Sequence, residues 1–503
     1  MELLNGALIT ASGWVWGPVT ILLLVGTGIY LTIRLGLIQL FSFRHAIDIV
    51  RGKFDDPDDE GDVSHFQALS AALSATIGVG NIAGVATAIA AGGPGAVFWM
   101  WVTALVGMAT KYASCLLALK YRVIHSDGTA GGGPMYFLEK GLGKKWLGTM
   151  FAVFAAVAAF GIGNMVQANS VADSLRNSMS VPTWVSGLVM AVLAGMVIVG
   201  GIKRIAGLAS RLVPFMAVAY VLGATAILLL HIETIPQSLA LIFKYAFTPT
   251  AAGGGFLGAV VAQTIRFGVA RGIFSNESGL GSAPIAHAAA KTKEPVREGL
   301  VAMVGPFADT IIICSMTALV IISTVIAKPP PEGRGRPTDT AWSTPLTRSF
   351  ESWPTEYVYD PATGYPRLNS DGKIEQRRLT GVPLTTTAFS WGLAKIGMDG
   401  VGEMIVSLGV VLFAFSTLVS WSYYGDRSIS YLFGLRAVMP YRMIYVILIV
   451  VGAIIKLDLV WNLSDVANAL MAVPNLVGLL ALSGVVANET RGYLLRRQEG
   501  ELP

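Results

Sequence analysis

Charged residues and cysteines are both scarce in this chain of 503 residues. Asp, Glu, Lys and Arg make up 13% of the sequence, compared with ~25% in an average soluble domain, while hydrophobic residues make up 53%. The two cysteines, Cys115 and Cys314, lie inside apolar stretches and form no CxxC pair. A water-soluble domain, a disulfide-rich scaffold and a cysteine-based zinc site are therefore excluded.

Enzyme signatures are also missing. The sequence contains no GxxxxGK[ST] phosphate loop, no GxSxG nucleophile turn and no HExxH zinc pair, and its five histidines are scattered along the chain. The formal net charge of +5 does not indicate nucleic-acid binding, because the Lys and Arg residues fall between apolar stretches. The sequence thus predicts neither an enzyme nor a pump with its own nucleotide site, and it predicts no cofactor.

Long apolar stretches fill most of the chain, and the mean hydropathy is +0.62. A hydrocarbon core of ~30 Å requires about 20 apolar residues per helix, and this rule predicts eleven spans. The predicted spans cover residues 18–38, 69–89, 96–119, 147–171, 185–199, 205–230, 256–289, 300–326, 401–424, 441–455 and 463–486. The fold class is therefore an all-α polytopic membrane protein.

Lys and Arg in the short connections predict the orientation. One side collects twenty of them and the other only three, namely Arg176, Lys244 and Lys456. Cytoplasmic loops are enriched in Lys and Arg, so we expect the N-terminus outside and the C-terminus in the cytoplasm, in a cell inner membrane.

The chain divides around its spans into two groups of five. The expected parts are an N-terminal helix and linker (1–65), a first five-helix group (66–232), an external connection (233–255), a second five-helix group (256–490) and a cytoplasmic tail (491–503). The second group includes a polar, proline-rich stretch, 328–387, which we expect to form an external cap or lid.

Each five-helix group opens on a span with an interruption. In the first, Gly78 and Gly80 lie at mid-membrane depth, where a glycine pair weakens the helix and exposes backbone. In the second, residues 271–284 are far richer in polar residues and glycine than their flanks. Paired broken helices indicate a transporter with a site at the membrane midplane, although small residues also permit close helix packing without any site.

Ionisable residues inside the spans need a partner or a function, because inserting each costs about 2.5–3.5 kcal/mol. These residues are Lys111, Arg266, Arg271, Glu277 and Asp309. Glu277 lies in the second interruption, where it can take part in a cation or amine site, and Arg271 can neutralise it. A structural ion pair is the alternative.

Two further spans place polar side chains toward the centre. Asn164 and Gln167 are three residues apart on one helix face, where their amides can contact a polar solute or connect neighbouring helices. Ser416, Thr417 and Trp421 follow one face of a later span. Adjacent hydroxyls near the carbonyls of a broken helix suit a small hard cation.

Five blocks of sequence resemble the alanine or glycine:cation symporter family, also called sodium:alanine symporters. These blocks are IGVGNIAGVATAI (77–89), GGPGAVFWMW (92–101), GGGPMY (131–136), RGIFSNESGLGSAPIAH (271–287) and WSYYG (421–425). The resemblance implies the leucine-transporter-like fold, with two inverted five-helix repeats after one extra helix. It also implies sodium-driven uptake of alanine, and of glycine or other small neutral amino acids, into the cell by alternating access.

The resemblance further implies roles for single residues. The residues expected to bind the substrate are Thr76, Gly78, Gly80, Asn81, Gln167, Phe274 and Trp421, the last as a limit on side-chain size. Those expected to bind sodium are Ala75, Gly78, Ser416 and Thr417, and those expected in coupling or gating are Asn164, Arg271, Asn276 and Glu277. A proton-coupled or uncoupled neutral amino acid exchanger and, more distantly, a passive channel remain as alternatives.

Overall fold

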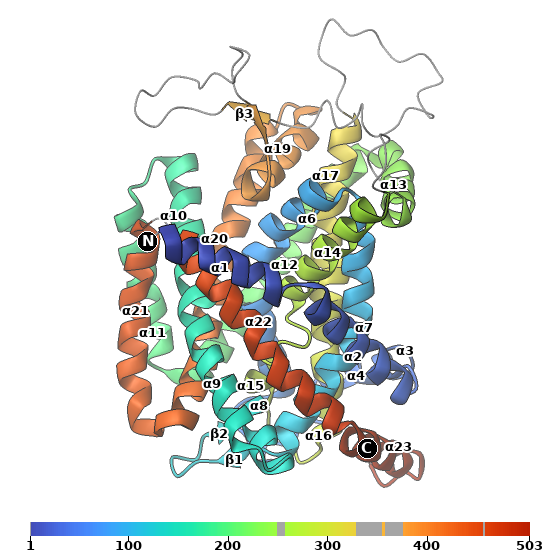
Figure 1. Cartoon of the computed structure of the whole chain (residues 1–503), viewed down its shortest axis with the longest axis vertical. Helices are drawn as coiled ribbons and strands as arrows, with labels where there is room; N and C mark the ends of the chain where they lie inside the picture. The colour runs from blue at the N-terminus through green and yellow to red at the C-terminus, as the bar shows by residue number, and fades with distance from the viewer. Residues whose placement is uncertain (1, 249–256, 328–354, 358–375, 456–457, 503) are drawn as a thin grey trace, which may run out of the picture.

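The computed structural model describes residues 2–248, 257–327, 355–357, 376–455 and 458–502, and these are mostly helical (Figure 1). Apolar stretches form helices here because a bilayer offers backbone N–H and C=O groups no other partners. The strands within the described residues form two antiparallel pairs, β1 (Val123–Ile124) with β2 (Ala130–Gly131) and β3 (Thr355–Tyr357) with β4 (Gln376–Arg378).

The first half of the chain contains the N-terminal helices and the helices of the first predicted group. The N-terminal helices are α1 (Glu2–Val15), α2 (Pro18–Arg34), α3 (Ile38–Phe41) and α4 (Phe43–Val50). The first group comprises α5 (His65–Thr76), η1 (Gly80–Gly84), α6 (Val85–Gly92), α7 (Gly95–Lys120), α8 (Pro134–Tyr136), η2 (Phe137–Gly141), α9 (Lys145–Phe160), η3 (Gly161–Met165), α10 (Val166–Met179), α11 (Thr183–Ile198) and α12 (Gly201–Leu230).

The second half begins with η4 (Ile232–Thr234) and α13 (Ile235–Phe247), which form the connection. The helices that follow are α14 (Leu257–Asn276), α15 (Ala283–His287), α16 (Pro295–Pro306), η5 (Phe307–Cys314), α17 (Ser315–Ala327), α19 (Gly381–Ala394), α20 (Asp399–Phe433), η7 (Leu435–Ala437), α21 (Val438–Ile454), α22 (Asp458–Ala481) and α23 (Ser483–Gln498). The turns η1, η2, η3 and η5 are π-helical.

Among the described residues, eight helices are long and apolar enough to cross a membrane. A ninth span results if the bent pair His65–Thr76 and Gly80–Gly92 is counted as one. The chain is therefore a multi-pass membrane protein. Two of the eleven predicted spans fall outside this count: stretch 185–199 corresponds to α11, which has only 16 residues, and stretch 256–289 is divided between α14 and α15.

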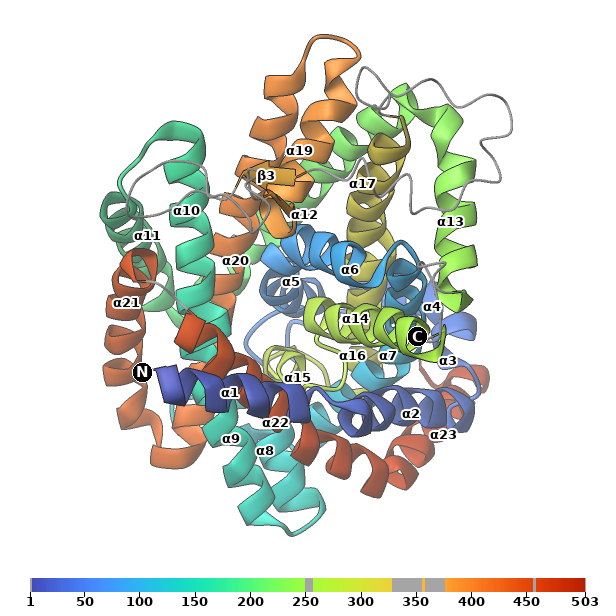
Figure 2. The ribbon, with the colours of Figure 1, turned by 45° about the horizontal axis from the view of Figure 1, so that its top comes forward.

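The interrupted helices lie in the middle of the molecule. Figure 2 shows α5, α6, α14 and α15 surrounded by longer helices, among them α7, α12 and α20. Both α7 and α16 are buried along most of their length. The polar residues of the interruptions are consequently shielded from lipid.

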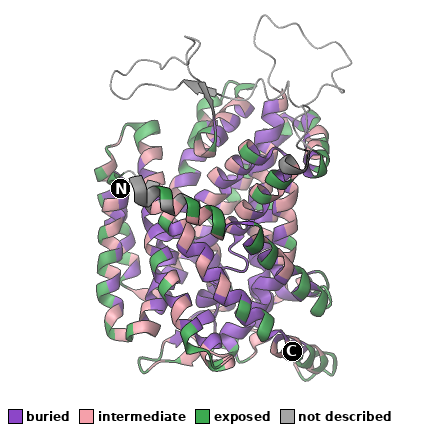
Figure 3. Cartoon of the chain, viewed as in Figure 1, coloured by how far each residue is buried: buried purple, intermediate pink, exposed green. Residues whose placement is uncertain are grey.

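The outer helices carry many exposed residues, which are green in Figure 3. Leu193 on α11, Leu222 on α12 and Ile447 on α21 are among the exposed large hydrophobic residues. In water such a surface is unfavourable, whereas acyl chains solvate it. The exposed apolar surface thus agrees with a membrane location.

Segments predicted on one side of the membrane lie at one end of the molecule. In Figure 1, β1, β2 and α23 lie at the lower end, and α13, α19 and β3 at the upper end.

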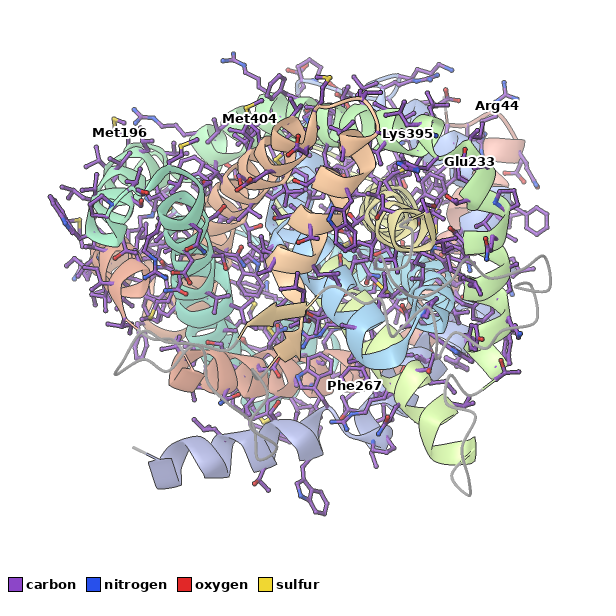
Figure 4. All side chains as sticks on the ribbon, turned by 90° about the horizontal axis from the view of Figure 1, so that it is seen from above. Arg44, Met196, Glu233, Phe267, Lys395 and Met404 are labelled. Atoms are coloured by element: carbon purple, nitrogen blue, oxygen red, sulfur yellow. The ribbon has the colours of Figure 1, made fainter. Side chains whose placement is uncertain are left out.

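Residues 328–354 and 358–375 of the predicted cap lie outside the described residues. Its last residues, 381–387, are not loop as expected but begin α19, which packs on α17 and α20. Lys395, just after α19, pairs with Glu233 of η4 at 3.3 Å (Figure 4).

Candidate functional site

The first break separates α5 from the half-helix that follows it. A capping box between Ser64 and Gln67 starts α5, the helix ends at Thr76, and the chain then turns by 53° before Gly80. Asn81 stabilises the turn, because its Oδ1 accepts a hydrogen bond of 2.9 Å from the N–H of Gly78. The predicted interruption of this span is therefore present.

Gly78 lies against α20 and α10. A Cβ atom at this position would lie 2.6 Å from Thr417 Oγ1 and 3.7 Å from Gln167 Oε1. Only a glycine lets the backbone approach the threonine hydroxyl this closely. The structure thus brings together Gly78, Gln167 and Thr417, three residues predicted for the site from distant parts of the chain.

The second break separates α14 from α15 and has a left-handed backbone at Glu277, Gly279 and Gly281. The positive φ of 55° at Glu277 is uncommon for a residue with a side chain. Its carboxylate accepts a hydrogen bond of 3.1 Å from Trp421 Nε1 and another from the hydroxyl of Ser282. These bonds hold the break against α20.

Two buried side chains bind the backbone of the second break. Lys111 Nζ donates to the carbonyl of Asn276 at 2.9 Å, and Asn475 Nδ2 donates to the carbonyl of Gly279 at 2.8 Å. The carbonyls released by the end of α14 are therefore satisfied by neighbouring helices. Asn276 is further held by α16–η5, since its Nδ2 donates to Thr310 Oγ1 at 3.1 Å.

The two breaks face each other. A Cβ atom at Gly80 would lie 3.4 Å from the Phe274 ring, and the guanidinium carbon of Arg271 lies 5.7 Å from the centroid of that ring. Arg271 interacts electrostatically with Asp465 of α22. The expected neutralisation of Glu277 by Arg271 is not found among the described ion pairs, because the backbone leaves the helix at Glu277 and the carboxylate bonds to Trp421 and Ser282 instead.

Oxygen atoms of α5 and α20 gather next to the first break. The hydroxyls of Ser416 and Thr417 donate to the carbonyl of Ser74 at 3.3 and 3.2 Å, and Thr417 Oγ1 lies 3.4 Å from the carbonyl of Ile77. Ala75 is buried within the same turn of α5. Ser416 also donates to its own helix, to the carbonyl of Phe413 at 2.9 Å, and the hydroxyl of Thr76 donates only within its helix, to the carbonyls of residues 72 and 73.

Gln167 and Asn164 bond to different segments of the chain. Asn164 Nδ2 donates to the carbonyl of Tyr445 on α21 at 2.6 Å, whereas Gln167 Nε2 donates to Ile162 within its own helix. The π-helical turn η3 changes the angular separation expected for an α-helix. Gln167 Oε1 is buried and has no hydrogen-bond partner among the described residues.

Asp309 received no site role from the sequence, yet it lies between the two breaks. Its carboxylate accepts hydrogen bonds from Asn81 Nδ2 at 2.6 Å, Ser275 Oγ at 2.8 Å and Thr310 Oγ1 at 2.7 Å. The sequence signal that could have identified Asp309 was the presence of an acidic residue in an apolar span. Its partners are distant in sequence, so the cluster becomes visible only in the structure.

In the described part of the chain, no group of three or more His, Cys, Asp or Glu residues is placed to hold a metal ion. The oxygen atoms near Thr417 and Asp309 are instead hydroxyls, carbonyls and one carboxylate. Hard cations such as sodium prefer ligands of this kind.

Comparisons with known proteins agree with this chemistry. The model of the sodium:alanine symporter family matches residues 1–503. The chain is 46% identical to the sodium/alanine symporter AgcS of Methanococcus maripaludis over 488 residues, 96% of each protein. It is 45% identical over 484 residues to an uncharacterised transporter of Haemophilus influenzae, covering 96% of this chain and 94% of the relative. It is 32% identical over 479 residues to the amino-acid carrier protein AlsT of Bacillus subtilis, covering 95% and 90%.

Proposed function

The chain belongs to the sodium:alanine symporter family, and from this we propose that it imports alanine by sodium-coupled symport. Glycine and other small neutral amino acids are proposed as further substrates, and alternating access as the mechanism. The supporting observation is the meeting of Gly78, Thr417 and the unpartnered Gln167 Oε1 at the first break. A buried acceptor without a donor is costly, and a substrate ammonium group would satisfy it.

The substrate carboxylate would lie at the start of the half-helix Gly80–Gly92. The first N–H groups of a helix have no partners within it and carry partial positive charge, so they attract a carboxylate. Thr76 and Asn81 flank this point. Phe274 and Trp421 would border the substrate side chain, and the buried Trp421 ring would exclude larger amino acids.

Sodium would bind between α5 and α20. The hydroxyls of Ser416 and Thr417, with backbone carbonyls near Ala75 and Gly78, would supply its oxygen ligands. In the present structure these hydroxyls donate to α5 carbonyls, and a cation at this place would interact with both kinds of oxygen. Because the first break also forms the amino-acid site, sodium binding would favour the backbone geometry that the amino acid requires.

The balance of buried charge supports a cation as the coupling species. Lys111 interacts electrostatically with Glu277 and with Asp309, so this group of three has one more negative than positive charge when all are ionised. Arg271 and Asp465 balance each other separately. A bound sodium ion would supply the missing positive charge, and the Asp309 cluster offers a second group of oxygen atoms for it.

Asn164, Arg271, Asn276 and Glu277 are proposed to act in coupling or gating. Their contacts join the breaks to helices on either side: Asn164 to α21, Arg271 to α22, Asn276 to η5 and Glu277 to α20. A movement of the broken helices would therefore be transmitted to these helices.

We propose a topology of eleven spans, in which an extra helix precedes two inverted repeats of five. The parts are divided as predicted from the sequence. Each predicted stretch coincides with a helix or a broken helix, and α11 together with α14–α15 completes the eleven. We place the protein in the cell inner membrane, with its N-terminus outside and its C-terminus in the cytoplasm, on the strength of the uneven distribution of Lys and Arg.

Uptake of labelled L-alanine into proteoliposomes tests the proposal. An inward sodium gradient is compared with an equal potassium gradient, and accumulation above the external concentration is expected only with sodium. Equilibration that is independent of sodium would contradict symport and favour an uncoupled exchanger.

A proton-coupled exchanger is the second candidate, because a proton on Glu277 or Asp309 would also balance the buried charge. An inward proton gradient without sodium distinguishes the two. Accumulation under that condition favours the exchanger, and accumulation that requires sodium at every pH favours the symporter.

A further inference from the structure

A cavity of about 400 Å³ lies at the lower end of the molecule as drawn in Figure 1, near β1 and β2. Its walls come from α20, α21, the turn before α12, the β1–β2 hairpin and the segment before α5. The charged residues that line it are Asp62, Asp127, Lys203, Arg427 and Arg442. It is separate from the site at the breaks, none of whose residues line it.

Most of these charges lack an ionic partner. Arg442 pairs with Asp426 at 2.6 Å. Lys203 and Arg427, however, form no ion pair with any residue that the structure describes, and neither do Asp62 and Asp127. The cavity is thus lined by two positive and two negative groups that form no close ion pair with one another, although Arg427 interacts electrostatically with Asp127.

Arg427 is the most informative of these residues, because only 5% of it is exposed. Its guanidinium carbon lies 5.3 Å from the centroid of the Tyr423 ring, and one Nη donates to Thr129 Oγ1 at 3.2 Å. Its Nε is buried without a partner. A guanidinium group with an unused donor next to a cavity is suited to bind a carboxylate.

The acidic groups come from the segment before α5 and from the β1–β2 hairpin, where Asp127 and Arg427 both bond to the hydroxyl of Thr129. Asp62 accepts a hydrogen bond of 2.9 Å from the N–H of Ala130, and Asp127 accepts bonds from both the N–H and the hydroxyl of Thr129. Burial raises the pKa of Asp127, but these hydrogen bonds contribute to a larger lowering. The pKa of Asp127 therefore lies below its ordinary value. Asp127 is therefore ionised at neutral pH and can attract an ammonium group.

The cavity adjoins two helices that form the central site. Arg427 is six residues beyond Trp421 on α20, which corresponds to about 9 Å of helix. Asp62 is three residues before the start of α5. A molecule that leaves the breaks along these helices toward the lower end would meet this cavity.

We propose that the cavity is a second, weaker binding site for an amino acid zwitterion, with the carboxylate at Arg427 and Lys203 and the ammonium group at Asp62 and Asp127. This inference rests on the proposed function for its substrate class. Both signs of charge select a zwitterion, because a simple anion would meet two carboxylates and a simple cation would meet two basic groups. Occupancy from the cytoplasm would retain released substrate near the central site.

Protection of an engineered cysteine tests the proposal directly. Met439 lines the cavity, and both native cysteines are buried, so Met439→Cys provides one accessible thiol. The purified protein in detergent is labelled with a methanethiosulfonate reagent at rising L-alanine concentrations. We expect labelling to slow by about threefold or more, with a half-effect near millimolar alanine, as suits a site that depends on a few polar contacts. The effect should not require sodium.

Second variants separate the cavity from the central site. In Met439→Cys, adding Arg427→Gln or Lys203→Gln should remove or weaken the protection, whereas adding Gln167→Ala should leave it unchanged. Lys203 is exposed, so its variant tests the site without disturbing the core. A cysteine at Lys144, an exposed loop residue outside the cavity lining, should label at a rate independent of alanine.

Either of two results would overturn the inference. One is labelling of Met439→Cys that alanine does not slow at about 100 mM, far above the expected dissociation constant. The other is protection of the Met439→Cys thiol by alanine that is lost when Gln167→Ala is added but is kept when Arg427→Gln or Lys203→Gln is added. Such protection would report a movement caused by the central site. If alanine protects the Met439→Cys thiol but proteoliposomes show no sodium-dependent uptake, the result would refute the proposed symport and still support this cavity site.

Discussion

The two helix breaks differ in what satisfies their polar groups. At the second break, Lys111 and Asn475 bind the backbone carbonyls, and Trp421 and Ser282 bind the carboxylate of Glu277. The first break is shorter and has no charged residue. Its closest neighbours include Gln167, whose carbonyl oxygen lacks a partner.

This difference suggests a division of roles. The second break has its carboxylate and two of its carbonyls bonded, although the hydroxyl of Ser278 there is buried without a partner, and these bonds fix its shape. The first break lies beside an unused amide acceptor that can bind a ligand. We therefore expect substitutions around the second break to reduce stability first, and substitutions around the first break to reduce transport in a folded protein.

Lys111→Met should have the largest effect. It removes the donor to the carbonyl of Asn276 and the positive charge near Glu277 and Asp309. Removing one partner of a buried charged group costs about 3–5 kcal/mol, so the folded yield and the melting temperature should both fall. Size-exclusion profiles and thermal unfolding in detergent measure this. A variant with wild-type melting temperature would contradict a structural role for the second break.

Gly78→Ala should abolish transport with less loss of stability. The new Cβ would lie 2.6 Å from Thr417 Oγ1, and crowding of this kind costs about 1–3 kcal/mol. We expect sodium-dependent alanine uptake to fall by about tenfold or more.

Gly84→Ala is the matched control, because a Cβ there meets nothing within 4 Å in the same broken span. Its uptake should equal that of the wild type. Equal activity in both variants would show that the contact between Gly78 and Thr417 is not required.

The sequence predicted both breaks because glycine and polar residues inside apolar spans are local signals. It assigned Gly78 and Gln167 to the substrate site and Gly78 and Thr417 to the sodium site, and the structure places the three residues close together. These predictions depended on composition and on the family resemblance, which do not require knowledge of how the helices pack.

Other features could not be predicted from spacing. Asn164 of the π-helical turn η3 bonds to α21, whereas Gln167 bonds within its own helix. The partners of Asp309 lie on three segments of the chain, and Arg271 interacts electrostatically with Asp465 and forms no described ion pair with Glu277. Contacts between distant segments depend on packing, so only the structure defines them.

Gln167→Ala tests the unused acceptor itself. Loss of a hydrogen bond to a charged ammonium costs about 1.5–3 kcal/mol, which corresponds to a rise of about tenfold or more in the alanine KM. Asn164→Ala is the comparison variant. It removes a nearby amide whose Nδ2 donates to the carbonyl of Tyr445. It should lower stability and leave KM nearly unchanged. The reverse pattern would place the ligand at Asn164.

Trp421 lies between the second break and η3, and its substitution should have the smallest effect on alanine uptake but a distinct effect on selectivity. Its indole N–H bonds to Glu277, while its side chain packs so closely against Gly163 that a Cβ there would clash. Trp421→Ala should let leucine and methionine compete with labelled alanine. Trp421→Phe removes the N–H but keeps an aromatic ring, so it should retain the selectivity and lose some stability. If Trp421→Ala leaves the competition profile unchanged, the ring serves the second break alone, and the limit on substrate size must lie with Phe274 or the backbone of the first break.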